Sequence, residues 1–180
     1  MSGNARAPTV VDVRPIPRQT SHMNPSEVLL LAFLIGVIAG LRTLTAPAVV
    51  AWAVHRHWLN LHSSPLALMG STAAVAVFAV LALGELIVDK LPSTPKRTML
   101  LGLFGRSVFG GLSGAAVAAA GAQSVAPGIV LGAAGAIAGA FAGYEVRKRV
   151  VRALKVPDLV IALFEDAVAI AGGLFIVSRF

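Results

Sequence analysis

The stretch that decides the fold is "GLRTLTAP", residues 40–47. It lies in the middle of an apolar run over residues 27–54, which is longer than the ~20 residues that a straight helix needs to cross a bilayer. Pro47 has no amide proton to donate to the carbonyl of Thr43, so the helix is predicted to kink or break near Pro47. The hydroxyls of Thr43 and Thr45 can satisfy backbone groups freed there.

The composition around this stretch is that of a membrane protein. The chain has 180 residues, of which 57% are hydrophobic and 13% are charged. A soluble domain has about 25% charged residues, and so much apolar surface could not be hidden from water. No alternating pattern indicates strands, and lipid tolerates only helices or closed barrels. The fold class predicted is therefore an all-α integral membrane protein.

Five apolar segments predict about five transmembrane helices, at residues 27–54, 65–89, 99–122, 127–147 and 157–178. Residues 26–180 then form a single transmembrane domain. Residues 1–25 hold four prolines and three arginines without an apolar face, and we expect a flexible cytoplasmic tail there.

The basic residues predict the orientation of such a bundle. In the five-helix arrangement, only Arg56 and Arg179 fall on one side, and the other side holds a much larger set. That set is Arg6, Arg14, Arg18, Lys90, Lys96, Arg97, Arg147, Lys148, Arg149, Arg152 and Lys155. The positive-inside rule places the N-terminus in the cytoplasm and Phe180 outside. Nucleic acid is not an expected partner, because no aromatic residues interleave these charges.

Ionisable side chains inside the predicted helices are the candidates for function. Burying an ionised group in lipid is costly, so such residues should face the bundle interior. The predicted substrate or ion pocket is lined by Arg42, Thr43, Thr45, Glu85, Arg106, Glu165 and Asp166. Asp89, Lys90 and Glu145 are expected at the membrane interface. Because a short turn joins their segments, Glu85 and Arg106 are expected to be in direct or one-water contact.

Two functions fit these charges. The first is a small permease or channel for an ion or a small polar solute. The alternative is a non-transporting scaffold or lipid-interacting protein, whose charges are structural salt bridges. An embedded enzyme is disfavoured, because no Ser–His–Asp, HExxH or P-loop pattern occurs and cysteine is absent. We expect no catalytic residue, cofactor or metal site, since the spacing of His55, His57 and His62 is loose.

The sequence also contains regularly spaced glycines and a weak internal similarity. Gly110 and Gly114 lie four apart, as do Gly135, Gly139 and Gly143, and this spacing predicts close helix packing within one chain or in a homodimer. "AGLRTLTA" resembles "FGRSVFGG", and "GELIVDK" resembles "GYEVRKR". A two-helix internal repeat would explain both likenesses.

From Ser26 onward the chain resembles an uncharacterised group of small membrane proteins, domain of unknown function 4126. The likeness rests on "GLRTLTAPAVVAWA" and "GELIVDKLPSTPKRT". The matching residues are Gly40, Arg42, Thr45, Pro47, Gly84, Glu85, Asp89, Lys90, Pro92, Pro95 and Arg97. The resemblance implies several helices in a bacterial inner membrane and implies no activity.

Overall fold

A computed structural model describes residues 23–61, 64–89, 100–154 and 158–180. Within these ranges the chain is helical and has no strand, which confirms the all-α part of the predicted class. The elements are α1 (Pro25–Leu41), α2 (Thr45–His55), the 3-10 helix η1 (Pro65–Gly70), α3 (Thr72–Val88), α4 (Leu100–Ala120), α5 (Val125–Leu154) and α6 (Asp158–Val177). The predicted tail lies almost wholly outside the described residues.

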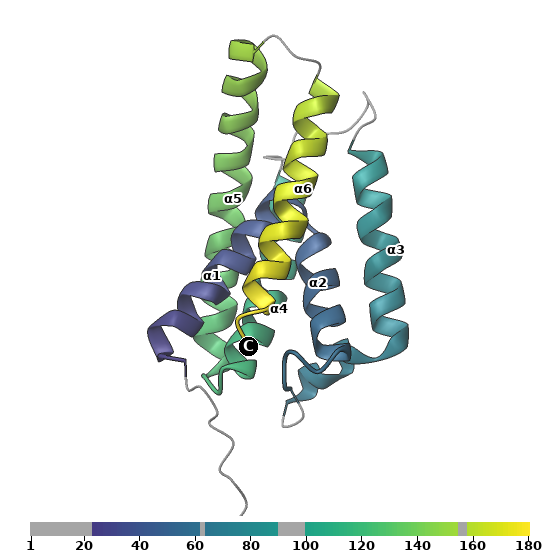
Figure 1. Ribbon diagram of the computed structural model, residues 1–180. Coiled ribbons are helices and arrows are strands. Elements are labelled where there is room, and N and C mark those ends of the chain that lie inside the picture. Colours follow the sequence, from purple (N-terminus) through teal and green to yellow (C-terminus); the bar gives the residue numbers. More distant parts are fainter. Residues whose placement is uncertain (1–22, 62–63, 90–99, 155–157) are drawn as a thin grey trace, which may run out of the picture.

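The run over residues 27–54 forms a helical hairpin and does not continue in one direction. Helix α1 ends at Leu41 and α2 begins at Thr45, and the chain reverses at residues 42–44, which we call the hairpin tip (Figure 1). A break is therefore present, slightly before the predicted position. Pro47 lies in the first turn of α2, where a missing amide proton costs no helical hydrogen bond.

The helices against which α1 and α2 pack also show that the chain reverses at the hairpin tip. Helix α1 runs parallel to α5, because Gly36 lies against Gly132 and Gly40 lies against Gly139. Helix α2 runs parallel to α6, and α5 and α6 are antiparallel (Figure 1). The two arms of the α1–α2 hairpin consequently point in opposite directions along the bundle.

This reversal places both described ends of the chain at one end of the bundle. The start of α1 and the C-terminus lie at the lower end in Figure 1, and the end of α3, the end of α5 and the start of α6 lie at the upper end. The sequence predicted that the N-terminus and Phe180 face opposite sides. The difference arises because residues 27–54 were counted as a single crossing.

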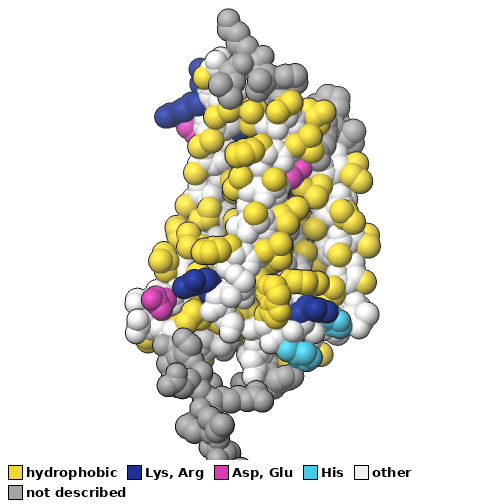
Figure 2. Space-filling view, viewed as in Figure 1, with side chains coloured by type: hydrophobic (Ala, Val, Ile, Leu, Met, Phe, Trp, Pro, Cys, Tyr) yellow, Lys and Arg dark blue, Asp and Glu magenta, His cyan; other side chains and the backbone are white. Residues whose placement is uncertain are grey.

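Three described helices are long and apolar enough to cross a membrane: Leu100–Ala120, Val125–Ala153 and Leu159–Val177. Helices α1, α2 and α3 are apolar but shorter, so the prediction of five transmembrane helices is not confirmed. Large apolar side chains cover the outside, among them Val80 and Phe164 at 68% and 69% exposed. Figure 2 shows them over the middle of the molecule, with the Lys and Arg side chains toward its two ends. This surface is consistent with a membrane protein.

Glycine lets α1, α4 and α5 pack backbone against backbone. A Cβ added at Gly36 would overlap the carbonyl oxygen of Gly132, and one at Gly114 would overlap that of Gly128. Gly110, Gly135, Gly139 and Gly143 also contact neighbouring helices of the same chain. The predicted close packing thus occurs within one chain, and the homodimer stays a prediction.

The two segments of the proposed internal repeat differ in the number and direction of their helices. Three α-helices, α1 to α3, precede Asp89, whereas α4 and α5 occupy the region to which the second repeat was assigned. Helices α1 and α4 are also antiparallel, since Gly40 meets Arg106 and Ala32 meets Gly114. The predicted two-helix repeat is therefore not visible in the described residues.

The hairpin predicts the outcome of cysteine labelling in membrane vesicles. Ser26, Ala153 and Ser178 are exposed and the native chain has no cysteine. Ser26→Cys and Ser178→Cys should react with an impermeant thiol reagent from the same side of the membrane, and Ala153→Cys from the other side. Labelling of Ser26→Cys and Ser178→Cys from opposite sides would restore a single crossing for residues 27–54.

The glycine contacts predict a second outcome. A methyl group at Gly132 would overlap the carbonyl oxygen of Gly110, so Gly132→Ala should lower the free energy of unfolding by about 1–3 kcal/mol. Gly105 has no atom within 4 Å of an added Cβ, and Gly105→Ala is the matched control that should raise stability by up to about 1 kcal/mol, because alanine favours a helix over glycine. Thermal unfolding in detergent measures both. Equal melting temperatures for the two variants would contradict the packing described.

Candidate functional site

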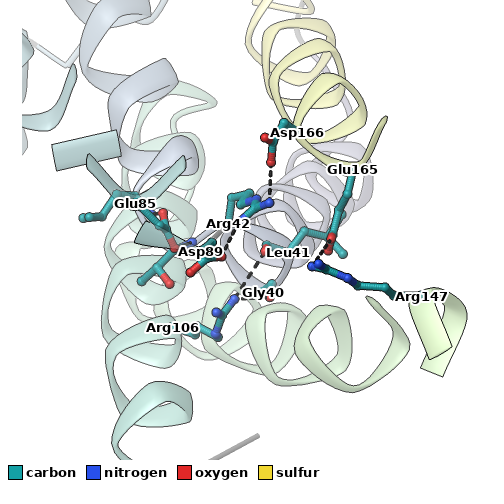
Figure 3. A network of polar contacts seen from close by, with 11 residues as sticks. Gly40, Leu41, Arg42, Glu85, Asp89, Arg106, Arg147, Glu165 and Asp166 are labelled. Carbon is teal, nitrogen blue, oxygen red and sulfur yellow. Dashed lines mark hydrogen bonds and ion pairs between the residues drawn. The ribbon is translucent and has the colours of Figure 1, made fainter. Parts of the chain in front are cut away.

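The hairpin tip gathers charged side chains from α3, α4 and α6 (Figure 3). A break in a helix leaves carbonyl groups at the end of one arm and amide groups at the start of the next without partners. Inside a bilayer no water is present to bind them, so protein groups must do so. At this tip the partners are ionised side chains.

Glu85, in the last turn of α3, binds the two amides that immediately precede α2. Its Oε1 accepts a hydrogen bond from the amide of Thr43 and its Oε2 accepts one from the amide of Leu44, both at 2.7 Å. The start of a helix carries a partial positive charge, which favours a carboxylate there. Glu85 therefore caps α2 from another helix.

Arg106, in the second turn of α4, binds the opposite end of the break. Its Nη1 donates to the carbonyl of Gly40 at 2.5 Å and to that of Leu41 at 3.4 Å. The residue is only 5% exposed. Because the end of a helix carries a partial negative charge, a guanidinium is favourable there. Each end of the break thus meets a side chain of opposite sign.

Arg42 lies within the break and is completely buried. Its Nη1 pairs with Oδ2 of Asp89, which follows α3 directly. Its Nη2 pairs with Oδ1 of Asp166 on α6 at 2.5 Å. One guanidinium at the tip therefore connects α3 and α6. We call Arg42, Glu85, Asp89, Arg106 and Asp166 the tip cluster.

A further ion pair lies beside the tip cluster, between α5 and α6. Nη1 of Arg147 is 3.6 Å from Oε2 of Glu165, and the side chains are 20% and 11% exposed. Glu145 pairs with Arg149 one turn along α5, on the outer surface of the helix.

The structure brings most of the predicted pocket residues together, with different roles. Arg42, Glu85, Arg106 and Asp166 converge at the tip, whereas Glu165 is adjacent and pairs with Arg147. Thr43 contributes its backbone amide. Thr45 begins α2 and is 4% exposed. The backbone groups of Gly40, Leu41 and Leu44 were not predicted, because a sequence does not show which peptide groups a break leaves unpaired.

The structure adds partners that were not predicted. Asp89, expected at the interface, pairs with Arg42 because the end of α3 meets the hairpin tip, and its level relative to the membrane stays a prediction. Glu85 and Arg106 cap opposite ends of the break, each on the backbone, and the predicted direct pairing is not found. Lys90 lies outside the described residues. Glu145 is half-exposed on α5, as an interfacial residue would be.

Three cavities were found along the described residues. Their volumes are about 650 Å³ between η1, α4 and α5, about 260 Å³ beside His55 and His57, and about 330 Å³ between α2, α3 and α6. None of these three is lined by a residue of the tip cluster, although Thr45 lines the last. The tip cluster therefore consists of paired charged side chains and borders none of these three cavities.

An all-helical bundle with three helices suited to cross a membrane, and with a charged cluster at a re-entrant break, has the architecture of a helical membrane protein. Over residues 29–178 the chain matches the family model Domain of unknown function (DUF4126), and it belongs to that family. No curated protein and no solved structure matches the chain. The family has no assigned activity, so any function must be argued from the tip cluster.

The tip cluster predicts that removing Arg42 alone lowers stability more than removing Arg42 together with its two carboxylate partners. Arg42→Met removes the guanidinium that pairs with both Asp89 and Asp166, and should cost about 3–5 kcal/mol of stability. Adding Asp89→Asn and Asp166→Asn to Arg42→Met should recover part of that loss. Arg149→Met, which breaks an exposed pair on α5, is the control and should cost about 0–1 kcal/mol. Thermal unfolding in detergent tests the order, and a triple variant less stable than Arg42→Met alone contradicts it.

Proposed function

We propose that the protein is a small permease or channel for an ion or a small polar solute, with a path that passes the hairpin tip. The observation that carries the proposal is the re-entrant break capped by charged side chains from α3 and α4. A charged side chain at the membrane centre costs about 2.5–3.5 kcal/mol by insertion scales, and such residues commonly mark ion or substrate paths. Broken helices also form the binding sites of many transporters.

The tip cluster, on this proposal, is a latch in its closed state. In transporters, the ends of broken helices bind the charged groups of the substrate. Here Glu85 occupies the amides of Thr43 and Leu44 just before α2, and Arg106 occupies carbonyls at the end of α1. Opening requires the carboxylate of Glu85 to leave Thr43 and Leu44, which frees the tip to move. Full burial of Arg42 fits a closed path.

The same proposal includes an orientation in a bacterial inner membrane. The last turns of α5 lie at one end of the bundle and carry four described basic residues, namely Arg147, Lys148, Arg149 and Arg152. The other end has two described basic residues, namely Arg56, which follows α2, and Arg179, which follows α6. The excess favours a cytoplasmic location for the first end. Both Pro25 and Phe180 then face outside.

A second candidate function is a non-transporting scaffold or lipid-interacting protein. The observation in its favour is that both ends of the break are capped and none of the three cavities reaches the tip cluster. On this alternative the ion pairs fix the helix arrangement and do nothing more. Flux measurements separate the two functions.

The test compares the native protein with Glu85→Gln in liposomes, for monovalent cations, divalent cations and small anions. A neutral amide weakens two charge-assisted hydrogen bonds, worth about 1.5–3 kcal/mol each, so flux of the transported species should rise roughly tenfold or more. Glu145→Gln removes an acid from the outer surface of α5 and is the matched control, with unchanged flux.

Each other outcome has a definite meaning. Background-level flux of every species for both folded proteins would reject transport and favour the scaffold. Flux that is present in the native protein but falls in Glu85→Gln would keep transport and reject the latch.

A further inference from the structure

One outward face of α5 carries side chains ordered by type along the helix. Apart from Arg149, which directly follows Lys148, its members recur at intervals of three, four or seven residues, which places them on the same side of a helix. They are Val130, Ile137, Phe141, Tyr144, Lys148, Arg149 and Arg152, and all are exposed. We call this face the α5 strip.

The order along the strip matches the layers of a membrane. Val130, Ile137 and Phe141 are apolar, Tyr144 follows, and the three basic residues come last. From Val130 to Lys148 the helix rises about 27 Å, close to the ~30 Å thickness of a bilayer core. Tyrosine is typical of the level where the hydrocarbon meets the head groups. The strip therefore passes from acyl chains to head groups.

The length of α5 places its basic end beyond the hydrocarbon. The helix has 30 residues and is about 45 Å long, so its last turns project past a ~30 Å core. Figure 2 shows basic side chains together with an acidic one at the upper end of the molecule, where Figure 1 places α5. This end can meet lipid phosphates.

Local contacts hold the basic residues next to one another. Nε of Arg152 donates to the carbonyl of Lys148 at 3.1 Å, and Nζ of Lys148 lies 6.0 Å from the centre of the Tyr144 ring. Nε of Arg149 donates to Glu145 at 2.8 Å. Three cations and one carboxylate leave a formal excess of two positive charges. Arg147 is not part of this group, because it faces Glu165.

We propose that the α5 strip binds an anionic phospholipid, with its phosphate at Lys148 and Arg152. Tyr144 lies at the glycerol level and an acyl chain lies along Phe141 and Ile137. A basic patch alone would suit any anion, but the apolar continuation of the same face favours a molecule that is anionic at one end and apolar along its length. Clusters of basic residues just outside a membrane helix recognise anionic lipids in this way. The proposal does not depend on transport.

The experiment places the full chain in nanodiscs of phosphatidylcholine with a minor share of phosphatidylglycerol. Native mass spectrometry then measures how many molecules of each lipid remain bound. The native protein should retain phosphatidylglycerol preferentially. Lys148→Gln with Arg152→Gln should lower that preference roughly tenfold, because each cation near the surface contributes substantially to anionic-lipid binding.

The control pair removes the same charge from the other end of the bundle. Arg56 and Arg179 are both exposed, and Arg56→Gln with Arg179→Gln should leave the preference unchanged. Glu145→Gln should raise the preference for phosphatidylglycerol, because Arg149 loses its carboxylate partner. A misfolded variant would not show such an increase. Inorganic phosphate should not displace the lipid, since it lacks the acyl chain.

Four results would overturn the proposal. They are an unchanged preference in Lys148→Gln with Arg152→Gln, an equal loss in the control pair, no gain in Glu145→Gln, and displacement of the lipid by inorganic phosphate.

Discussion

The arrangement depends on one constraint, namely that the backbone groups at the hairpin tip must be bonded inside the protein. The carboxylate of Glu85 satisfies the amides of Thr43 and Leu44, and Arg106 satisfies the carbonyl of Gly40. Unbonded groups in an apolar interior would cost several kilocalories per mole each, by the general cost of burying polar groups. This requirement fixes the end of α3 and the second turn of α4 against the tip.

Close packing of α1 and α4 against α5 acts together with these hydrogen bonds. Gly36 and Gly40 bring α1 into backbone contact with α5, and Gly114 does the same between α4 and α5. Without larger side chains between them, α1 can lie deep in the bundle and carry Arg42 to a fully buried position. The glycine contacts and the ion pairs therefore support the same geometry.

The outer surface and the tip cluster bear on different questions. Exposed apolar side chains such as Val80 and Phe164 are consistent with a lipid environment, but they do not indicate an activity. Transport is proposed from the buried charges of the tip cluster, because ionisable residues inside a membrane bundle commonly mark ion or substrate paths.

The sequence by itself determined the helical class, the apolar segments, the break near Pro47 and the burial of Arg42, Arg106 and Asp166. These features follow from local composition and from the cost of charge in lipid, which act along the chain and need no partner. It also indicated that glycines at intervals of four would make close helix contacts.

Only the tertiary structure decided the direction of α2, the common end for Pro25 and Phe180, and the partner of each charge. A break in a helix is visible in sequence, but the angle across it depends on what the two arms pack against. Asp89 shows the same limit, because its position beside Lys90 did not indicate that Arg42 of the hairpin tip pairs with it. Which residues distant in sequence pair with one another depends on how the helices pack in space. The local pattern of residues along the sequence does not show this packing.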